Sequence, residues 1–315
     1  MRSNYGTKIT MNGQSRKSVA EVFDDFVVSQ TAQGLSDVTI STYRHHIRSV
    51  SNHLDIQKSL ESLTRKDLEA MVVSMRVAGL AHNSISSYCR VLRTFLNWCR
   101  RNGMSVPEMP HIKDKETVKE SYTDDELLAL LKRPKKNCSF CEYRNWVIVN
   151  FLMNSGCRSA TIRNIQNRDV DLDTRQIIFR HNKNGRIQTT PLCSPMVSIL
   201  REYMAIRGGK PEDFLFCDQY GGMLSMNGLR LAIARHNQSR GVEKTSAHLY
   251  RHTFARKYLV DCGGDAFMLQ KLLGHSTLKM TKHYCAIYDA DIAKDYDRFS
   301  PLAQMSGTKE KLKRR

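Results

Sequence analysis

The stretch Gln176-Ile-Ile-Phe-Arg-His-Asn-Lys-Asn-Gly-Arg-Ile-Gln-Thr-Thr190 decides the fold class, because it interrupts a chain whose other patterned segments are helical. Two runs of β-like composition, residues 176–179 and 187–190, flank the dipeptide Asn184-Gly185. Asn-Gly is a strong signal for a tight hairpin turn between antiparallel strands. We therefore predict one β-hairpin inside an otherwise helical domain.

On both sides of this hairpin, apolar residues recur at the spacing of amphipathic helices. Thr123-Asp-Asp-Glu126 has the form of a capping box and predicts the first helix of the domain. Helical spacing returns at residues 142–154, after Gly156, and at 195–206, 227–236, 247–261, 266–273 and 278–284. Residues 122–300 are therefore expected to form a mixed, mostly helical domain with a small β-hairpin or sheet insertion.

The first part of the chain predicts a small all-helical domain over residues 18–103. Four helices are expected, and they begin at about Ser18, Ser36, Thr64 and Asn83. Residues 104–121 carry prolines and charges without periodicity, which is typical of a linker. Residues 1–17 and the basic residues 301–315 are expected to be flexible tails. The fold class is therefore mainly α, with two domains.

The charge of the chain favours a polyanionic partner. The net charge is +18, and it is shared: residues 1–105 carry 14 basic against 8 acidic side chains, and the remainder carries 35 against 23. Contacts from both domains to a nucleic acid would explain this distribution, because each neutralised phosphate releases condensed counterions. A solvated basic surface is the alternative interpretation.

The composition also indicates the compartment. The amino terminus lacks an apolar stretch beside its charges, and no apolar run is long enough to span a bilayer. We expect a cytoplasmic, nucleoid-associated protein with no membrane partner. The nine cysteines are odd in number and scattered, which favours reduced thiols. Cys138-Ser-Phe-Cys141 lacks a second pair of ligands at suitable spacing, so no metal site is expected.

A series of basic and aromatic residues at defined spacing lies in the second part. Ser155-Gly-Cys-Arg158 places an arginine at a helix start, and Lys183 lies in the hairpin. His248-Leu-Tyr-Arg251 places an imidazole and a guanidinium three residues apart, on one face of a helix. Leu273-Gly-His275-Ser276 follows, and Tyr284 comes nine residues after His275. Singly, each residue has an ordinary structural explanation; the order and spacing of all six indicate a function.

This order of motifs resembles the catalytic signature of the tyrosine recombinase family, which includes phage integrases, Xer-type recombinases and integrases of transposons and conjugative elements. The resemblance covers essentially the whole chain, because the four-helix domain is similar to the family's core-binding (SAM-like) DNA-binding domain. Three departures are present: Thr161 replaces an acidic residue, Tyr250 replaces a leucine, and Cys262-Gly-Gly-Asp265 is one residue longer than in Xer-type members. Because Thr161 cannot orient Arg158 as an acid would, a different acid is expected to do so.

The resemblance implies a chemistry that the residue types can perform. Tyr284 would attack a DNA phosphodiester, with His248 accepting the phenol proton, because a hydroxyl with a pKa of about 10 needs a base. Arg158 and Arg251 would clamp the non-bridging oxygens, and His275 would add a hydrogen bond. Lys183 would protonate the departing 5′-oxygen. The 3′-phosphotyrosine conserves the bond energy, so neither a metal, ATP nor another cofactor is expected.

The expected partner is double-stranded DNA at recombination sites, with accessory proteins as possible further partners. Candidate DNA contacts are basic residues of the first domain and the linker: Arg44, His45, Arg48, Arg90, Arg93, Arg100, Arg101, Lys113, Lys115 and Lys119. A solvated helix face is the alternative for each of them. Residues 291–305 have a weakly apolar pattern after the nucleophile. In the family such a segment docks onto a neighbouring protomer, which implies a homotetramer on DNA with exchange of this segment.

Two rival functions are left open. A type IB topoisomerase shares the catalytic logic but only relaxes DNA, and the two-domain layout with its trailing segment favours a recombinase. A non-catalytic DNA-binding protein of the same fold would not need Tyr284, and the complete residue set argues against it. The expected function is integration or excision of a mobile element, or resolution.

Overall fold

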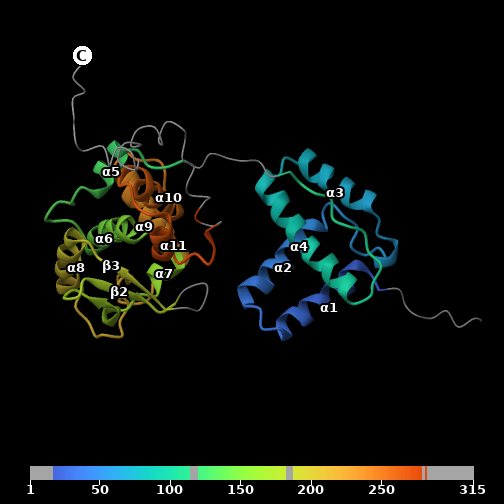
Figure 1. Ribbon diagram of the computed structural model, residues 1–315, viewed down its shortest axis with the longest axis horizontal. Coiled ribbons are helices and arrows are strands. Elements are labelled where there is room, and N and C mark those ends of the chain that lie inside the picture. The colour runs from blue at the N-terminus through green and yellow to red at the C-terminus, as the bar shows by residue number, and fades with distance from the viewer. Residues whose placement is uncertain (1–16, 114–119, 182–186, 279–280, 282–315) are drawn as a thin grey trace, which may run out of the picture. The chain divides into compact units, whose positions relative to one another are not determined.

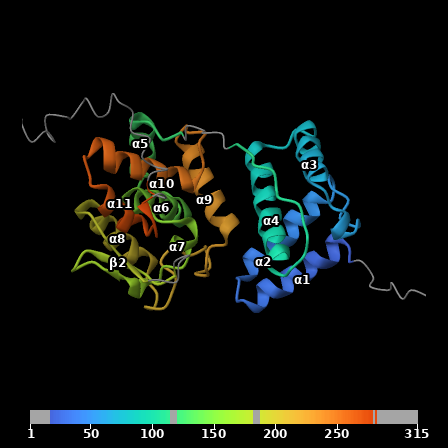
Figure 2. The same cartoon turned by 45° about the vertical axis from the view of Figure 1, so that its right-hand side comes forward.

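The computed structural model describes residues 17–113, 120–181, 187–278 and 281. The chain divides into two compact units, residues 1–117 and residues 118–315, and each is described by itself. Figures 1 and 2 show both units from two directions. None of the described helices is long and apolar enough to cross a membrane.

The first unit is the expected set of four helices: α1 (Val19–Ala32), α2 (Asp37–Val50), α3 (Arg65–Val77) and α4 (His82–Arg101), with a short 3₁₀ turn η1 (Leu60–Ser62) between α2 and α3. The predicted starts are confirmed in detail, because Ser18 and Thr64 form capping boxes with the residues three positions later. The core centres on Phe23, Phe26 and Phe95, whose ring centroids lie 5.2–5.7 Å apart.

Part of the segment expected to be a linker packs against this helical unit. The guanidinium of Arg93 donates to the carbonyl of Pro110 at 3.3 Å, and that of Arg100 donates to the carbonyl of Pro107 at 3.2 Å. Met109 between them is buried in the core of the unit. Residues 104–113 are therefore held on α4 by side chains that the sequence presents as surface arginines.

The second unit is built around one central helix, α6 (Phe140–Ser155) (Figure 1). Helices α5 (Asp124–Leu131), α8 (Ser194–Arg207), α9 (Met226–Ser239) and α10 (Ala247–Arg256) pack against it. Most of its side chains are buried, so its sequence shows no single apolar stripe. The remaining elements are α7 (Ser159–Arg163), the 3₁₀ turn η2 (Asn167–Asp169), α11 (Ala266–Leu273) and a π-helical turn η3 (Lys257–Asp261), where an unbroken helix over 247–261 was expected.

The predicted β insertion is a three-stranded antiparallel sheet in the order β1 (Val170–Asp171), β2 (Gln176–Phe179), β3 (Gln188–Pro191). Phe179 pairs with Gln188 at the end of the hairpin, and Gln176 pairs with Pro191 at its base. Ile177 and Phe179 point into the core, as the alternation of a half-buried strand requires. The mainly helical fold with a small sheet is therefore confirmed, with β3 one residue later than expected.

Tyr250, a departure from the family pattern, anchors α10 through a buried polar network. Its hydroxyl donates to the side-chain carbonyl of Asn237 on α9 at 2.7 Å. The Asn237 amide donates in turn to the Tyr122 hydroxyl at 2.9 Å, and the backbone N–H of Tyr122 donates to Thr253 of α10 at 3.0 Å. A leucine could not make these bonds, so Tyr250 fixes α10 against α9 and the start of the unit.

The turn at Gly156 brings α6, α10 and α11 together. Gly156 ends α6 in the left-handed conformation with φ at 57°, which glycine adopts without steric cost. A Cβ at this position would lie 2.4 Å from a ring carbon of Phe254 on α10 and 2.9 Å from a methyl carbon of Leu273 on α11. The backbone can approach its neighbours this closely only because the side chain is absent.

Gly156→Ala should therefore destabilise the second unit by at least about 2 kcal/mol, because the left-handed strain and the overpacking add. The free energy of unfolding from urea denaturation, followed by the fluorescence of Trp146, measures this. Gly241→Ala is the matched control, since Gly241 also has a positive φ (73°) but no atom within 4 Å of its Cβ position. Equal losses for the two variants would contradict the argument from close approach.

Candidate active site

The structure brings together three of the six residues predicted to be catalytic. Arg158 is the N-cap of α7, Arg251 lies in the middle of α10, and His275 follows α11 directly. Arg158 and Arg251 line one small cavity of about 10 Å³, together with Cys157, Thr161, Phe179, Gln188, Leu272 and Leu273. Lys183 and Tyr284 lie outside the described residues.

Arg251 is a buried cation whose side chain is only 2% exposed. Its Nη1 donates to the carbonyl of Gly156 at 2.8 Å, and its Nη2 donates to the carbonyl of Leu273 at 3.0 Å. These carbonyls belong to the turns that end α6 and α11. The guanidinium is thus held by the backbone of two helix ends, where partial negative charge is concentrated. This fixes its plane before any substrate arrives.

His275 accepts a hydrogen bond from Arg251, which defines its protonation state. The distance between Arg251 Nη2 and His275 Nε2 is 2.7 Å. A guanidinium can only donate, so Nε2 must carry a lone pair and the proton must be on Nδ1. The Nδ1–H then donates to the hydroxyl oxygen of Thr281 at 2.8 Å. His275 is therefore a neutral imidazole, held at both nitrogens.

Burial and the two arginines keep this imidazole neutral. Desolvation lowers the pKa of His275 to about 4, and the charges of Arg251 and Arg158 act in the same direction. The thiol of Cys157 in the same cavity is also neutral, because burial raises its pKa to about 11. The two arginines at this cavity thus place positive charge beside neutral groups, and such charge stabilises an anion that binds next to it.

His248 is exposed at the amino-terminal end of α10, about one helical turn before the buried Arg251. Its ring meets the buried ring of His252 edge to face, with the centroids 4.8 Å apart. His252 was assigned a structural role from the sequence, and it packs directly beneath His248. Because His248 is exposed, it is accessible to a substrate. Its ring is oriented by the contact with His252, which lies about one turn later in the same helix.

Thr161, the departure that raised the question of how Arg158 is oriented, is buried in the middle of α7 and lines the same small cavity. Its backbone N–H donates to the carbonyl of Arg158 at 2.9 Å, within the first turn of that helix. The acid expected to orient Arg158 stays a prediction.

Three contributors to the site were missed by sequence reasoning. The carbonyl of Gly156 has no side-chain signal, Thr281 was read only as part of a helix, and Gln188 was read only as a strand residue. The signal for Thr281 was a polar residue six positions after His275, too common a feature to single out. Their roles depend on contacts between segments that are distant in the chain.

The candidate DNA contacts of the first unit occupy neighbouring helices, since α2 and α4 pack together. Arg44, His45 and Arg48 line a groove of about 380 Å³ along α2. Arg90 on α4 is exposed. The pKa of the half-buried His46 on α2 is lowered mainly by desolvation, next by the charge of His45 and least by that of Arg90. One nitrogen of the Arg93 guanidinium donates to the carbonyl of Pro110. Lys113 is exposed, and Lys115 lies outside the described residues.

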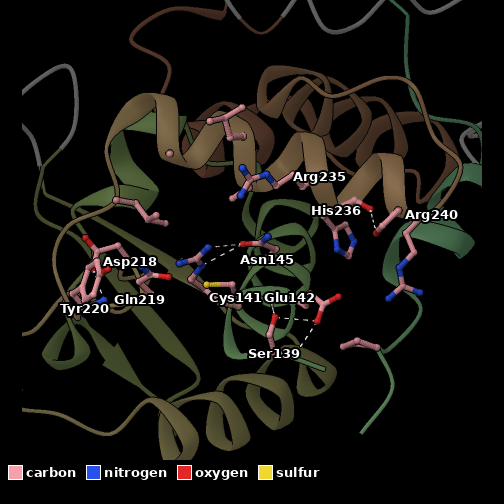
Figure 3. A pocket seen from close by; sticks show the side chains of 17 residues that line it. Ser139, Cys141, Glu142, Asn145, Asp218, Gln219, Tyr220, Arg235, His236 and Arg240 are labelled. Carbon is pink, nitrogen blue, oxygen red and sulfur yellow. Dashed lines mark hydrogen bonds between the residues drawn. The ribbon is translucent and has the colours of Figure 1, made fainter. Parts of the chain in front are cut away.

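A separate pocket of about 650 Å³ lies between the start of α6, α9 and the turn at 218–224 (Figure 3). None of the described residues predicted to be catalytic lines it. Arg144, Arg235 and Arg240 contribute positive charge. Two acids also line it, but Glu142 caps α6 and Asp218 accepts from backbone N–H groups of its own turn. Arg144 is buried and donates to the side chain of Asn145 and the carbonyl of Cys217.

Comparison with known proteins places both units in one family. The model of the phage integrase family matches residues 120–291, and that of the phage integrase N-terminal SAM-like domain matches residues 24–103. Among curated relatives, tyrosine recombinase XerC of Shewanella amazonensis is 24% identical over 88% of this chain and 94% of its own length. Tyrosine recombinase XerD of Staphylococcus epidermidis is also 24% identical, over 91% and 99%.

Solved structures share the fold. The Tn1549 transposon integrase in complex with transposon right end DNA superposes with a TM-score of 0.74 at 17% identity, over 90% of this chain and 99% of that one. A lambda integrase tetramer bound to a Holliday junction gives a TM-score of 0.71 at 17% identity, over 89% and 81%.

The neutral state of His275 predicts a pH dependence of stability. Because its folded-state pKa of about 4 lies below the ordinary value of 6.5, the unfolded chain binds a proton between these pH values that the native chain excludes. The free energy of unfolding should therefore fall as the pH is lowered from 6.5 towards 4. The decline should be shallower in His275→Gln, which retains the other histidines; parallel curves for the two proteins would refute the assignment.

Proposed function

Because the chain belongs to the phage integrase family, the tyrosine recombinases, we propose that it cuts and rejoins DNA at specific sites through a 3′-phosphotyrosine at Tyr284. The observation that carries this proposal is the group formed by the partly buried Arg158 and the buried Arg251 and His275. These residues come from three parts of the chain: Arg158 and Arg251 line one small cavity, and His275 is hydrogen-bonded to Arg251. An arrangement of this kind stabilises the charge that develops on an attacked phosphate.

In the proposed cleavage step, the Tyr284 oxygen forms a bond to phosphorus and the bond between phosphorus and the 5′-oxygen breaks. The phenol proton passes to His248, whose exposed position at the start of α10 leaves it within reach of a substrate. The departing 5′-oxygen takes a proton from Lys183 in the hairpin. Rejoining reverses these transfers with the 5′-hydroxyl of another strand, so the phosphodiester energy is conserved and no nucleotide is consumed.

The hydrogen bonds of His275 change the role proposed for it, which was to donate a hydrogen bond to the phosphate. Its Nε2 lone pair faces Arg251, so the imidazole orients the guanidinium in the absence of DNA. Phosphate binding beside it supplies negative charge, which raises the pKa of a histidine. We infer that His275 first holds Arg251 in place and donates to the phosphate only after it takes up a proton.

DNA engagement is proposed to involve both units. The exposed Arg44, Arg48 and Arg90 on α2 and α4, together with Lys113 and Lys115, would neutralise phosphates outside the cleavage site, and Arg93 would do so with the donors that Pro110 does not occupy. Such contacts add affinity without reading bases. The substrate would be chromosomal or mobile-element DNA in the cytoplasm, at paired sites that accessory proteins can help to align.

We further propose that the active form is a homotetramer in which residues 291–305 of one copy dock onto the next. Residues 289–305 carry four aspartates against the two basic residues Lys294 and Arg298, among apolar residues, and are therefore weakly acidic: Asp289, Asp291, Asp295 and Asp297. The pocket beside α9 offers charge of the opposite sign from Arg144, Arg235 and Arg240 (Figure 3). Complementary charge of this kind selects a partner and its register.

The Tyr284 assignment predicts a covalent protein–DNA adduct. On a nicked suicide substrate that carries the chain's own site, the wild-type protein should form an adduct that resists denaturation, in the presence of EDTA. Tyr284→Phe removes the attacking oxygen, so the adduct should be lost while DNA binding in a gel-shift assay is kept.

Two outcomes would favour the rival functions. An absence of adduct from the wild-type protein on its true site would favour a non-catalytic DNA-binding protein. Relaxation of supercoiled DNA without exchange between paired sites would favour a topoisomerase. Recombination of paired sites, detected as resolved or integrated products, supports the proposal.

The docking proposal predicts that removal of residues 291–315 lowers the yield of synaptic complexes on native gels at least 10-fold, while cleavage of a single half-site persists. Arg235→Glu should have the same effect, because it repels the acidic segment. Arg201→Glu on α8 is the matched control, since Arg201 is exposed but does not line the pocket. Equal effects of the two charge reversals would contradict this docking site.

A further inference from the structure

The carboxyl-terminal end of α11 is held by a side chain from the β-hairpin. Gln188 of β3 donates from its Nε2 to the carbonyl of Leu272 at 2.7 Å and to that of Lys271 at 3.3 Å. The last carbonyls of a helix have no partner within the helix. The carbonyl of Lys271 also accepts from the backbone N–H of Gly274 at 3.1 Å, so the shorter bond from Gln188 goes to the carbonyl of Leu272, the next one along the helix end. The same amide nitrogen lies 3.3 Å from the hydroxyl of Thr190 on its own strand.

The oxygen of this amide packs closely against the turn after α11. A Cβ on Gly274 would lie 2.4 Å from the Gln188 oxygen, so the end of the Gln188 side chain would have to shift if residue 274 carried a Cβ. Gly274 also has φ at 62°, in the left-handed region. The Gln188 amide thus contacts both the last carbonyls of α11 and the backbone that leads into His275.

Arg251 is a second side-chain donor at this helix end. Gln188 takes those of Lys271 and Leu272, and Arg251 takes that of Leu273. Both side chains line the same cavity as Arg158. A shift of the α11 end would therefore move an acceptor of Arg251 and, one residue further on, the backbone of His275.

We propose that Gln188 is a positioning residue for the phosphate clamp: by holding the end of α11, it sets the geometry of Arg251 and His275. It would not touch the reacting atoms. The inference rests on the proposed function, because it assumes that Arg251 stabilises the charged phosphate during cleavage. Misplacement of a catalytic group by about 1 Å costs up to about 10²-fold in rate. A hydrogen bond that does not touch the reacting atoms can therefore still change the rate of cleavage.

The test compares single-turnover cleavage of three half-site substrates: the natural phosphodiester, a methylphosphonate at the scissile position, and a 5′-bridging phosphorothiolate. The methylphosphonate lacks one charged oxygen, so it depends less on the clamp. The phosphorothiolate has a leaving group that departs without a proton, so it depends less on Lys183. Gln188→Met keeps the length of the side chain and removes the donor.

We expect Gln188→Met to cleave the phosphodiester about 10-fold more slowly than wild type, and the methylphosphonate within about 3-fold of wild type. Arg251→Ala should show the same relief on the methylphosphonate, to a larger degree. Thr189→Met is the matched control, because Thr189 is exposed on the same strand; it should match wild type on every substrate. Gln188→Asn, whose amide is one methylene too short to reach Leu272, repeats the test should the methionine variant not fold.

The opposing outcomes are distinct. An equal loss for Gln188→Met on all three substrates, with Arg251→Ala relieved by the methylphosphonate, would overturn the inference and leave the clamp in place. If the phosphorothiolate is the single substrate on which Gln188→Met regains the wild-type rate, Gln188 supports the proton transfer from Lys183. That result also overturns the inference. A lack of relief for Arg251→Ala would refute the clamp in the proposed function, and the role of Gln188 with it.

Discussion

The second unit depends on how one buried guanidinium is satisfied. Arg251 is nearly inaccessible to water, and burial of a cation is costly unless hydrogen bonds compensate. Its hydrogen-bond partners include the carbonyls of Gly156 and Leu273 and the imidazole of His275. Each lies where a helix ends or a turn begins. The ends of α6 and α11 must therefore meet at α10, and the small cavity forms at this meeting point.

This constraint explains several features that otherwise look unrelated. Gly156 and Gly274 both have positive φ, and at both positions a side chain would clash with a neighbouring element. The neutral state of His275 follows from the same burial, because its nitrogen must accept from a group that can only donate. The adjacent Tyr250 holds α10 through its bond to Asn237 of α9, so the helix that carries Arg251 is also anchored on a second face.

A site organised in this way is built before its substrate arrives. Hydrogen bonds to backbone carbonyls orient Arg251, and the imidazole is oriented at both nitrogens. Preorganised charge costs no rearrangement when an anion binds, which is the main source of electrostatic catalysis. Of the two groups proposed for proton transfer, His248 is exposed at the start of α10, and Lys183 lies outside the described residues. His248 thus differs from Arg251 in its access to solvent, although both belong to one helix.

The sequence alone determined the helix starts, the hairpin and the order of the motifs, because caps, turns and periodicity are local and leave a readable pattern. Its motif spacing also predicted that Arg158, Arg251 and His275 belong to one site, and the structure brings these three residues together. Only the tertiary structure decided the tautomer of His275, the contacts of Gln188 and Thr281, and the attachment of Arg93 to Pro110. These depend on hydrogen bonds between segments far apart in the chain, and such bonds impose no periodicity on the sequence.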